Sequence, residues 1–390
     1  MGALVGEFDL QAPQAIWSVE GYPRAQVLFR NAGVPIGWMP VQLRQAAVLT
    51  VEELKQVAED SGILEFALNA DPTPYSKPSI TVIVCTRDRP MTLRRCLASL
   101  NSLRYDNLQV LVVDNASRSS ETKDVVAEAQ FQYLRENKPG LDWARNCGLQ
   151  AASTEIVAYT DDDVKVDSNW LNAIARGFSD PQVSCVTGLV CPIELQTEAQ
   201  VLFEENGGMR KGLWPRSFER QNIEDNPLIA TQLCGVGANM AFRREALLEV
   251  GGFDIHLDVG TPSHGSGDLD IFHRLHTAGK LIRYEPSAVV WHQHRRSMPA
   301  LYKQFYDNGR AFGCYLLKTL SNRTLPVKDV VRFVVTDWIG SWMFFGERPG
   351  RRPMLVAAEI WGMLHAPWAF WKTYRRIPLL SRVPSTPLAG

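Results

Sequence analysis

The sequence predicts an α/β fold built around a mainly parallel sheet. Ser79–Cys85 and Leu108–Val113 are continuous apolar runs rich in β-branched residues, as expected for strands buried on both faces. Between these runs, Pro90 can start a helix, and apolar residues follow at helical spacing over Leu93–Leu100. Strands that alternate with helices in this way form parallel sheets with right-handed crossovers.

The same alternation continues downstream. Val125–Gln130 and Asp142–Ala152 are expected to be helices, and Phe131–Leu134 and Ile156–Tyr159 are expected to be strands. The last of these strands runs into three consecutive acids, Asp161–Asp163.

We expect three segments along the chain. Residues 1–77 form an N-terminal accessory unit and linker, in which Ala25–Val41 is a hairpin and Val51–Ser61 is a helix. Residues 78–300 form the α/β domain. Residues 301–390 form a helical, basic and Trp-rich segment.

Composition and charge exclude several classes of protein. The chain has 390 residues, with 41 Lys and Arg against 42 Asp and Glu, so a nucleic-acid partner is not expected. Apolar residues make up 45% and charged residues 21%, which are globular proportions. The seven Cys form no C-x-x-C pair, and the N-terminus has no signal-peptide pattern. These features predict reduced thiols and a cytoplasmic location.

The C-terminal segment leaves two interpretations open. Residues 301–390 hold 13 Lys and Arg against 5 Asp and Glu, a net charge of +8, and five of the eleven Trp. This composition is typical of a peripheral contact with a membrane, here through 321–390 at the inner face. Ordinary helices that pack their Trp on the core fit equally well. Charged residues interrupt every apolar run, so a spanning helix is not expected.

Polar residues follow three of the expected strands, at Thr86–Arg89, Asp114–Ser117 and Thr160–Asp163. Ligands bind at the carboxyl ends of strands in open α/β sheets, so these segments should meet in one crevice. Helix capping accounts for Asn115 and Ser117 but not for three adjacent acids. Adjacent carboxylates repel one another unless a cation lies among them. Oxygen ligands of this kind suit Mg²⁺ or Mn²⁺.

An ordered set of motifs resembles the family 2 glycosyltransferases of the GT-A fold. These motifs are TRDRP, VVDNAS, GLDWARNCG and TDDD, followed by GANMAFRREAL, GGFD, GSGDLDIFHRL and YEPSAVVWHQHR. The resemblance covers roughly residues 78–315. It implies an inverting enzyme that uses a nucleotide-diphospho-sugar donor.

The resemblance also implies roles for residues at the nucleotide side of the crevice. Thr86 and Arg87 would begin the nucleotide pocket, and Asp114 would recognise the base. Arg145 would reach the phosphates, since a guanidinium fits phosphate oxygens. Asp161 would contact the ribose and join the metal, and Asp163 would hold the metal.

Two further positions complete the implied site. His292 is favoured over His294 as an additional metal ligand, and an imidazole suits Mn²⁺ more than Mg²⁺. Asp268 is the implied catalytic base, because an inverting transfer needs one carboxylate to accept the acceptor proton. Many relatives have Glu before this Asp, whereas this chain has Gly267. His256–Ser266 fits either a mobile loop over the donor or a passive surface loop.

The resulting hypothesis is a metal-dependent inverting glycosyltransferase, with a UDP-sugar as the favoured donor. Its acceptor would be a hydroxyl of a glycan, a lipid-linked sugar or a small metabolite. Two alternatives are a sugar-nucleotide nucleotidylyltransferase and a non-catalytic glycan- or nucleotide-binding scaffold on the same fold. The first would need a Gly-rich loop after the first strand, and TRDRP contains no Gly. The second has no need for the acids at 161, 163 and 268.

Overall fold

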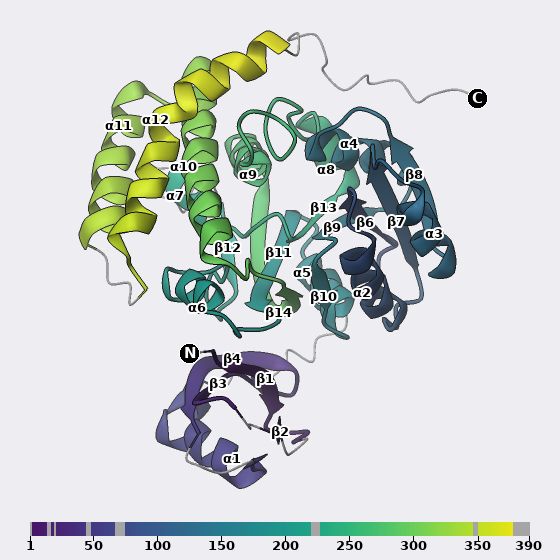
Figure 1. Ribbon diagram of the computed structural model, residues 1–390. Helices are drawn as coiled ribbons and strands as arrows, with labels where there is room; N and C mark the ends of the chain where they lie inside the picture. Colours follow the sequence, from purple (N-terminus) through teal and green to yellow (C-terminus); the bar gives the residue numbers. More distant parts are fainter. Residues whose placement is uncertain are drawn as a thin grey trace.

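The computed structural model describes residues 2–13, 17–18, 21–43, 48–66, 75–219, 227–345 and 350–376 (Figure 1). A nine-stranded mixed sheet with helices on both sides forms its centre. A small β-containing unit precedes this sheet and a group of helices follows it. The α/β architecture predicted from the sequence is therefore confirmed.

The central sheet has the strand order β10-β14-β11-β13-β9-β6-β7-β8, and β12 pairs with β14. Its strands are β6 (Ile80–Thr86), β7 (Leu108–Asn115), β8 (Gln132–Glu136), β9 (Ile156–Asp161), β10 (Val164–Val166), β11 (Val183–Pro192), β12 (Arg216–Phe218), β13 (Asn239–Arg243) and β14 (Leu281–His292).

Strands β6, β7, β8 and β9 are parallel, as the alternation of strands and helices predicts. Thr86 lies opposite Asp114, and Cys85 lies opposite Asp161, so the polar strand ends are level with one another. Strand β13 is antiparallel to both of its neighbours, whereas β11 and β14 are parallel. The expected meeting of polar segments at one edge of the sheet is therefore observed.

Short helices cover the sheet. They are α2 (Pro90–Asn101), α3 (Glu121–Glu128), α4 (Leu141–Ala151), α5 (Trp170–Gly177), α6 (Glu198–Glu205), α7 (Pro227–Leu233), α8 (Arg244–Glu249) and α9 (Gly267–Thr277). Helix α3 begins four residues earlier than expected, and its buried residues are Thr122, Val125 and Val126.

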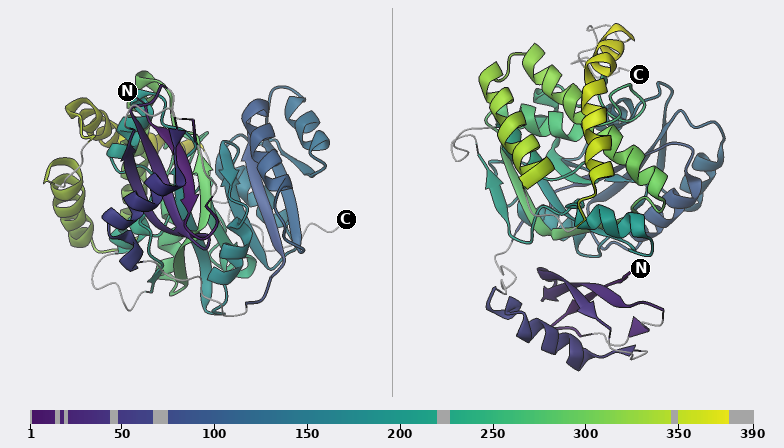
Figure 2. Two further views of the ribbon diagram at one scale, coloured as in Figure 1. Left: turned by 90° about the horizontal axis from the view of Figure 1, so that it is seen from below. Right: turned by 60° about the vertical axis from the view of Figure 1, so that its left-hand side comes forward.

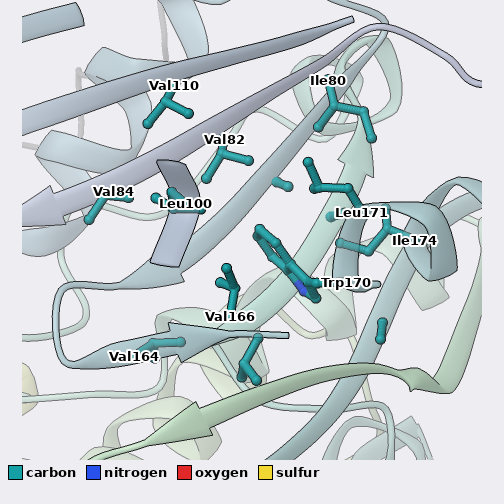
Figure 3. Close-up of a cluster of buried hydrophobic side chains, with 14 of the residues drawn as sticks. Ile80, Val82, Val84, Leu100, Val110, Val164, Val166, Trp170, Leu171 and Ile174 are labelled. Carbon is teal, nitrogen blue, oxygen red and sulfur yellow. The ribbon is translucent and has the colours of Figure 1, made fainter. Parts of the chain in front are cut away.

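Figure 3 shows the apolar cluster that fixes one face of the sheet. Side chains from β6 and β7 meet side chains from α2, β10 and α5 there. Trp170 is fully buried, and its Nε1 donates to Asn239 Oδ1 at 2.9 Å. This bond joins α5 to the first residue of β13, so the antiparallel strand is held in register.

The N-terminal unit contains β1 (Leu4–Asp9), β2 (Trp17–Ser18), β3 (Arg24–Asn31), β4 (Val34–Gln42), β5 (Val48–Leu49), α1 (Val51–Asp60) and the 3₁₀ helix η1 (Ile63–Phe66). The expected hairpin is confirmed as β3 and β4, and the expected helix as α1. Strand β1 adds a parallel neighbour to β3 that the sequence did not predict. Residues 67–74 of the expected linker lie outside the described residues.

The N-terminal unit packs against the central sheet near β10 and β14. Arg30 Nη2 lies 2.6 Å from Asp167 Oδ2, and both side chains are largely buried. The rings of Trp38 and Trp291 lie 6.5 Å apart between centroids. Trp291 directly precedes His292 in β14, so the unit supports the strand that carries this expected metal ligand.

Four elements follow the sheet: α10 (Met298–Ser321), α11 (Val327–Phe333), the π-helical η2 (Val334–Phe345) and α12 (Pro353–Arg376). Helices α10 and α12 lie so close together that there is no room for a side chain at two glycines. A Cβ at Gly309 would overlap Glu359 O, and a Cβ at Gly362 would overlap Tyr306 O. In Figure 2, α11 and α12 lie outside α10, away from the sheet. Within the described ranges, no helix has both the length and the apolar character needed to cross a bilayer.

Candidate active site

Two adjoining cavities open at the edge of the sheet where the polar strand ends meet. One, of about 410 Å³, is lined by Thr86, Arg87 and Asp161–Asp163, and we call it the Asp163 cavity. The other, of about 340 Å³, is lined by Arg145 and Asp268 among others, and we call it the Asp268 cavity. Asp161 lines both cavities. Asp161 is one of the expected metal ligands, so the expected metal group borders the cavity that holds the expected base.

Asp161, Asp163 and His292 form a group that could hold a metal ion. One potential ligand atom from each residue lies within 4.8 Å of the others. Asp161 ends β9 and His292 ends β14, while Asp163 lies between β9 and β10. His292 Nε2 is 3.2 Å from Asp163 Oδ1, and His292 Nδ1 is buried without a hydrogen-bond partner. Two carboxylates and an imidazole are a donor set that suits a divalent transition metal.

Asp163 and His292 each shift the pKa of the other. Burial lowers the pKa of His292, but the adjacent Asp163 carboxylate outweighs burial and raises this pKa above its usual value. Burial raises the pKa of Asp163, but His292 and Arg89 outweigh burial and hold this pKa well below its usual range. Asp163 is therefore ionised and ready to accept a cation.

Arg89 and Thr86 organise the middle acid. Arg89 Nη1 lies 2.6 Å from Asp162 Oδ1, and Arg89 Nη2 lies 2.9 Å from Asp163 Oδ2. Thr86 Oγ1 donates to Asp162 Oδ2 at 2.6 Å. Burial raises the pKa of Asp162 to about 7. The Thr86 hydroxyl is therefore engaged by Asp162, whereas Arg87 lines the cavity with 41% of its side chain exposed.

Asp114 lies at the end of β7 as expected, but protein donors surround its carboxylate. It accepts from Ser117 N at 2.9 Å, from Tyr133 Oη at 2.7 Å and from Arg135 Nη1 at 2.8 Å. The residue is 1% exposed and does not line the Asp163 cavity. Recognition of a base by Asp114 stays a prediction.

Arg145 lies in a cluster of buried charges, and its expected contact with the phosphates stays a prediction. Its Nη1 lies 2.9 Å from Asp142 Oδ1 and 2.6 Å from Asp258 Oδ2, and all three side chains are buried. Arg145 lines the Asp268 cavity and not the Asp163 cavity. These contacts make Arg145 the centre of a buried ion triad.

Asp268 lies in the first turn of α9. Its Oδ2 accepts from Gly237 N and its Oδ1 accepts from Leu269 N, both at 2.9 Å. Burial raises the pKa of Asp268, and the nearby Asp258 carboxylate raises it further. A carboxylate with a raised pKa is a stronger base, so the position suits proton abstraction.

The expected loop His256–Ser266 lines both cavities through Val259. Several contacts anchor it, however. Leu141 N donates to Val259 O at 2.8 Å, and Gly260 lies so close to Gly140 that a Cβ would come within 2.7 Å of the Gly140 Cα. Together with the Asp258–Arg145 pair, these contacts fix the loop against the start of α4.

His294 and Asp270 take structural positions. His294 Nε2 lies 2.8 Å from Glu204 Oε1, and burial lowers the pKa of His294 to about 3. Asp270 Oδ2 lies 2.8 Å from Arg274 Nε, and Asp270 Oδ1 lies 2.6 Å from Lys318 Nζ. The preference for His292 over His294 agrees with this geometry, because only His292 belongs to the Asp161–Asp163 group.

Sequence reasoning assigned no role to three residues around the site. Arg89 forms ion pairs with Asp162 and Asp163. Its position in TRDRP, at the end of a strand, could have indicated that it lies in the site. Asp258 and Lys318 had no comparable signal, because the residues that they contact lie far away in the sequence.

The family is shown by comparison with known proteins. Residues 81–251 match the family model described as "Glycosyl transferase family 2". The matched region begins in β6 and contains the three acids at 161–163. Residues 81–251 are therefore a domain of glycosyltransferase family 2.

Individual relatives differ in similarity. The pre-mycofactocin glycosyltransferase of Mycobacterium tuberculosis (strain H37Rv) is 33% identical over 314 residues, which are 78% of this chain and 62% of that protein. The chain thus spans less than two thirds of that relative. Glycosyltransferase AglE of Haloferax volcanii is 24% identical over 270 residues, with 67% of this chain and 80% of AglE covered.

Among solved structures, the mannosyltransferase PcManGT from Pyrobaculum calidifontis, in complex with GDP-Man and Mn²⁺, has a TM-score of 0.46 and 20% identity. The alignment covers 83% of this chain and 80% of PcManGT.

Proposed function

We propose that this protein is a metal-dependent inverting glycosyltransferase. The observation that carries the proposal is the position of Asp161, a candidate metal ligand that also lines the cavity of the candidate base. A donor in the Asp163 cavity would place its anomeric carbon near this junction, and an acceptor in the Asp268 cavity would approach from the opposite side. This arrangement suits one direct displacement with inversion.

The residues around the Asp163 cavity suit a nucleotide-diphospho-sugar. Asp161, Asp163 and His292 would hold Mn²⁺ or Mg²⁺, and the imidazole favours Mn²⁺. The bound ion would neutralise charge on the leaving diphosphate. Arg87 and Arg295, both lining this cavity, supply further cationic groups toward the phosphates. A UDP-sugar is the favoured donor because of the resemblance of the sequence motifs.

Asp268 would accept the proton of the acceptor hydroxyl as that oxygen attacks the anomeric carbon. The bond from this carbon to the diphosphate oxygen breaks, and the nucleoside diphosphate leaves with the bonding electrons. The N–H groups of Gly237 and Leu269 hold the two carboxylate oxygens in place and leave each a further lone pair. The acceptor would be a glycan, a lipid-linked sugar or a small molecule.

The test combines nucleotide binding with sugar transfer. Thermal shifts with UDP, GDP, dTDP and CMP, each with and without Mn²⁺, should reveal one Mn²⁺-dependent nucleotide. A ligand at 100 times its Kd stabilises the folded state by about 2.7 kcal/mol. Transfer from radiolabelled nucleotide-sugars is then measured on glycans, lipid extracts and pre-mycofactocin, the last because of the name of the M. tuberculosis relative.

Asp268→Asn is the diagnostic variant. It should keep the Mn²⁺-dependent nucleotide shift but lose about 10²- to 10⁴-fold in kcat for transfer. Asn can still accept from Gly237 N, so the fold should persist. Full transfer activity of Asp268→Asn would remove the base assignment. The absence of any nucleotide shift would favour a non-catalytic scaffold.

A further inference from the structure

Helix α12, and α11 together with η2, each carry a row of exposed apolar residues. Along α12 they follow spacings of three and four residues: Met354, Ala357, Trp361, Leu364, Trp368 and Trp371. Along α11 and η2 they recur at every fourth residue: Val327, Val331, Val335 and Ile339. We call these ten residues the outer apolar surface. Trp361 and Leu364 are 57% and 64% exposed, which is unusual for side chains of this size.

The opposite side of α12 is used for packing inside the protein. Leu355, Ala366 and Ala369 are buried, and Gly362 lies against the backbone of α10. Figures 1 and 2 show α11 and α12 as the helices farthest from the central sheet on this side. Trp338 in η2 packs inward against Phe312, with ring centroids 6.1 Å apart, whereas the Trp residues of α12 face outward. The residues of the outer apolar surface therefore do not take part in the packing of α12 against the rest of the protein.

The most exposed charged side chains around the outer apolar surface are positive. Within the described residues of α11, η2 and α12, the exposed charged side chains are Lys328 and Arg332, and the exposed Arg352 directly precedes α12. The acids of the same elements are half-buried or buried, at Asp329, Asp337 and Glu359. Lys372 adds a cation 4.4 Å above the ring of Trp368. The whole segment 301–390 has a net charge of +8, in a chain whose total is −1.

We propose that the outer apolar surface docks on a lipid bilayer that contains anionic headgroups. Trp is enriched at the interface between hydrocarbon and water, where its ring is apolar and its N–H stays hydrated. Cations beside an apolar helix face add attraction to anionic lipids. Because no described helix can cross a bilayer, these helices would lie in the plane of the interface.

A second helix is the competing occupant, since spacings of three and four also form coiled-coil seams. Positions that flank such seams usually carry charges of both signs, which set the partner and its orientation. Here the exposed flanking charges are all positive, which fits an anionic surface better.

Glu359, on the inner side of α12, lines the Asp268 cavity. Docking would therefore hold this cavity about one helix diameter, roughly 10 Å, from the headgroups.

Flotation of the full chain with vesicles tests the proposal, and no substrate is needed. Vesicles of phosphatidylcholine with phosphatidylglycerol should carry the protein upward in a density gradient, and vesicles of phosphatidylcholine alone should carry much less. The triple variant Trp361→Gln/Leu364→Gln/Trp368→Gln should lose at least tenfold in bound fraction. Its matched control is Leu64→Gln/Met91→Gln/Ile193→Gln, which alters three exposed apolar side chains elsewhere and should bind normally.

Charge reversal gives an independent arm. Lys328→Glu/Arg332→Glu should weaken binding to the anionic vesicles by about fivefold for each cation removed. Lys55→Glu/Lys123→Glu, with the same change of net charge at exposed positions elsewhere, should have little effect. Absence of flotation on anionic vesicles, or equal flotation of the Trp variant, would overturn the proposal. The proposal would also be overturned if the protein bound no vesicles but sedimented as a dimer, and if the Trp variant sedimented as a monomer.

Discussion

Arg145 and Asp258 form a buried ion pair, at 2.6 Å between Nη1 and Oδ2, that joins α4 to the loop before α9. Asp142 shares the same guanidinium at 2.9 Å, and its Oδ2 is buried without a hydrogen-bond partner. The triad occupies the space beside Gly267, where a Cβ would come within 2.5 Å of Asp142 Oδ2. A single cation thus holds two acids next to the helix that carries Asp268.

Arg145→Met should destabilise the protein by about 3–5 kcal/mol, because it leaves two buried carboxylates without their cation. Urea denaturation measures this change. Asp258→Asn in the same chain should restore part of the loss, since one of the two uncompensated charges disappears. A stable Arg145→Met protein that had lost nucleotide binding would instead support a phosphate contact.

Asp163 and Asp162 should respond differently to the same substitution. Asp163→Asn removes one ligand of the candidate metal group and should weaken Mn²⁺ binding at least about tenfold. Asp162→Asn is the matched control, because Asp162 is engaged by Thr86 and Arg89 outside this group. Titration calorimetry with MnCl₂ compares the two variants. Equal losses of affinity would contradict the assignment of ligands.

His273 should make stability depend on pH. It lies in α9 with Nδ1 2.7 Å from Tyr315 Oη, and burial lowers its pKa from about 6.5 to about 4. Between these values the unfolded state binds the proton and the folded state does not. The free energy of unfolding should therefore fall as the pH falls from about 6.5 to about 4, by at most about 3 kcal/mol from this residue.

His273→Gln checks this expectation because Gln does not titrate. Urea denaturation of both proteins at several pH values between 4 and 7 should give curves that diverge, with the shallower dependence in the variant. All other titrating groups are common to both, so parallel curves would show that His273 contributes nothing.

Gly362 should tolerate no side chain. A Cβ there would overlap Tyr306 O in α10, so Gly362→Ala should force α10 and α12 apart and cost about 1–3 kcal/mol. Such a cost lowers the Tm by about 2–4 °C for each kcal/mol in a domain of this size. Ala357→Ser, on the exposed side of the same helix, should leave the Tm unchanged. Equal Tm values for the two variants would contradict the close contact.

The parallel half of the sheet was predictable because its signals are local. Apolar strands, helical spacing and polar strand ends predicted β6 to β9. The resemblance of the motifs pointed to Asp161, Asp163 and His292, whose potential ligand atoms lie close together. The ion pair of Arg145 was not predicted, because its partner Asp258 is 113 residues away and no sequence pattern links the two. The sequence also did not explain why position 267 is a glycine. Two carboxylates from other elements occupy the space that a side chain at this position would need.

The open alternative for the C-terminal Trp residues shows the same limit. Helical spacing indicates helices, but it does not tell which side of a helix meets α10. Trp338 turned out to pack inward, whereas Trp361 and Trp368 point outward. The side of α12 that faces α10 is set by the close contact of the two helices at their glycines. This contact is a feature of the tertiary structure, so the sequence pattern of α12 does not reveal it.

The contact between Trp38 and Trp291 has a consequence for how the chain unfolds. Leu28, Leu189, Cys191 and Val289 are fully buried in the same cluster, which is built from both the N-terminal unit and the central sheet. Removal of the first 66 residues would expose this cluster to water beside His292 and favour aggregation. The two parts should therefore melt in one cooperative transition, as a single folding unit rather than as two modules joined by a linker.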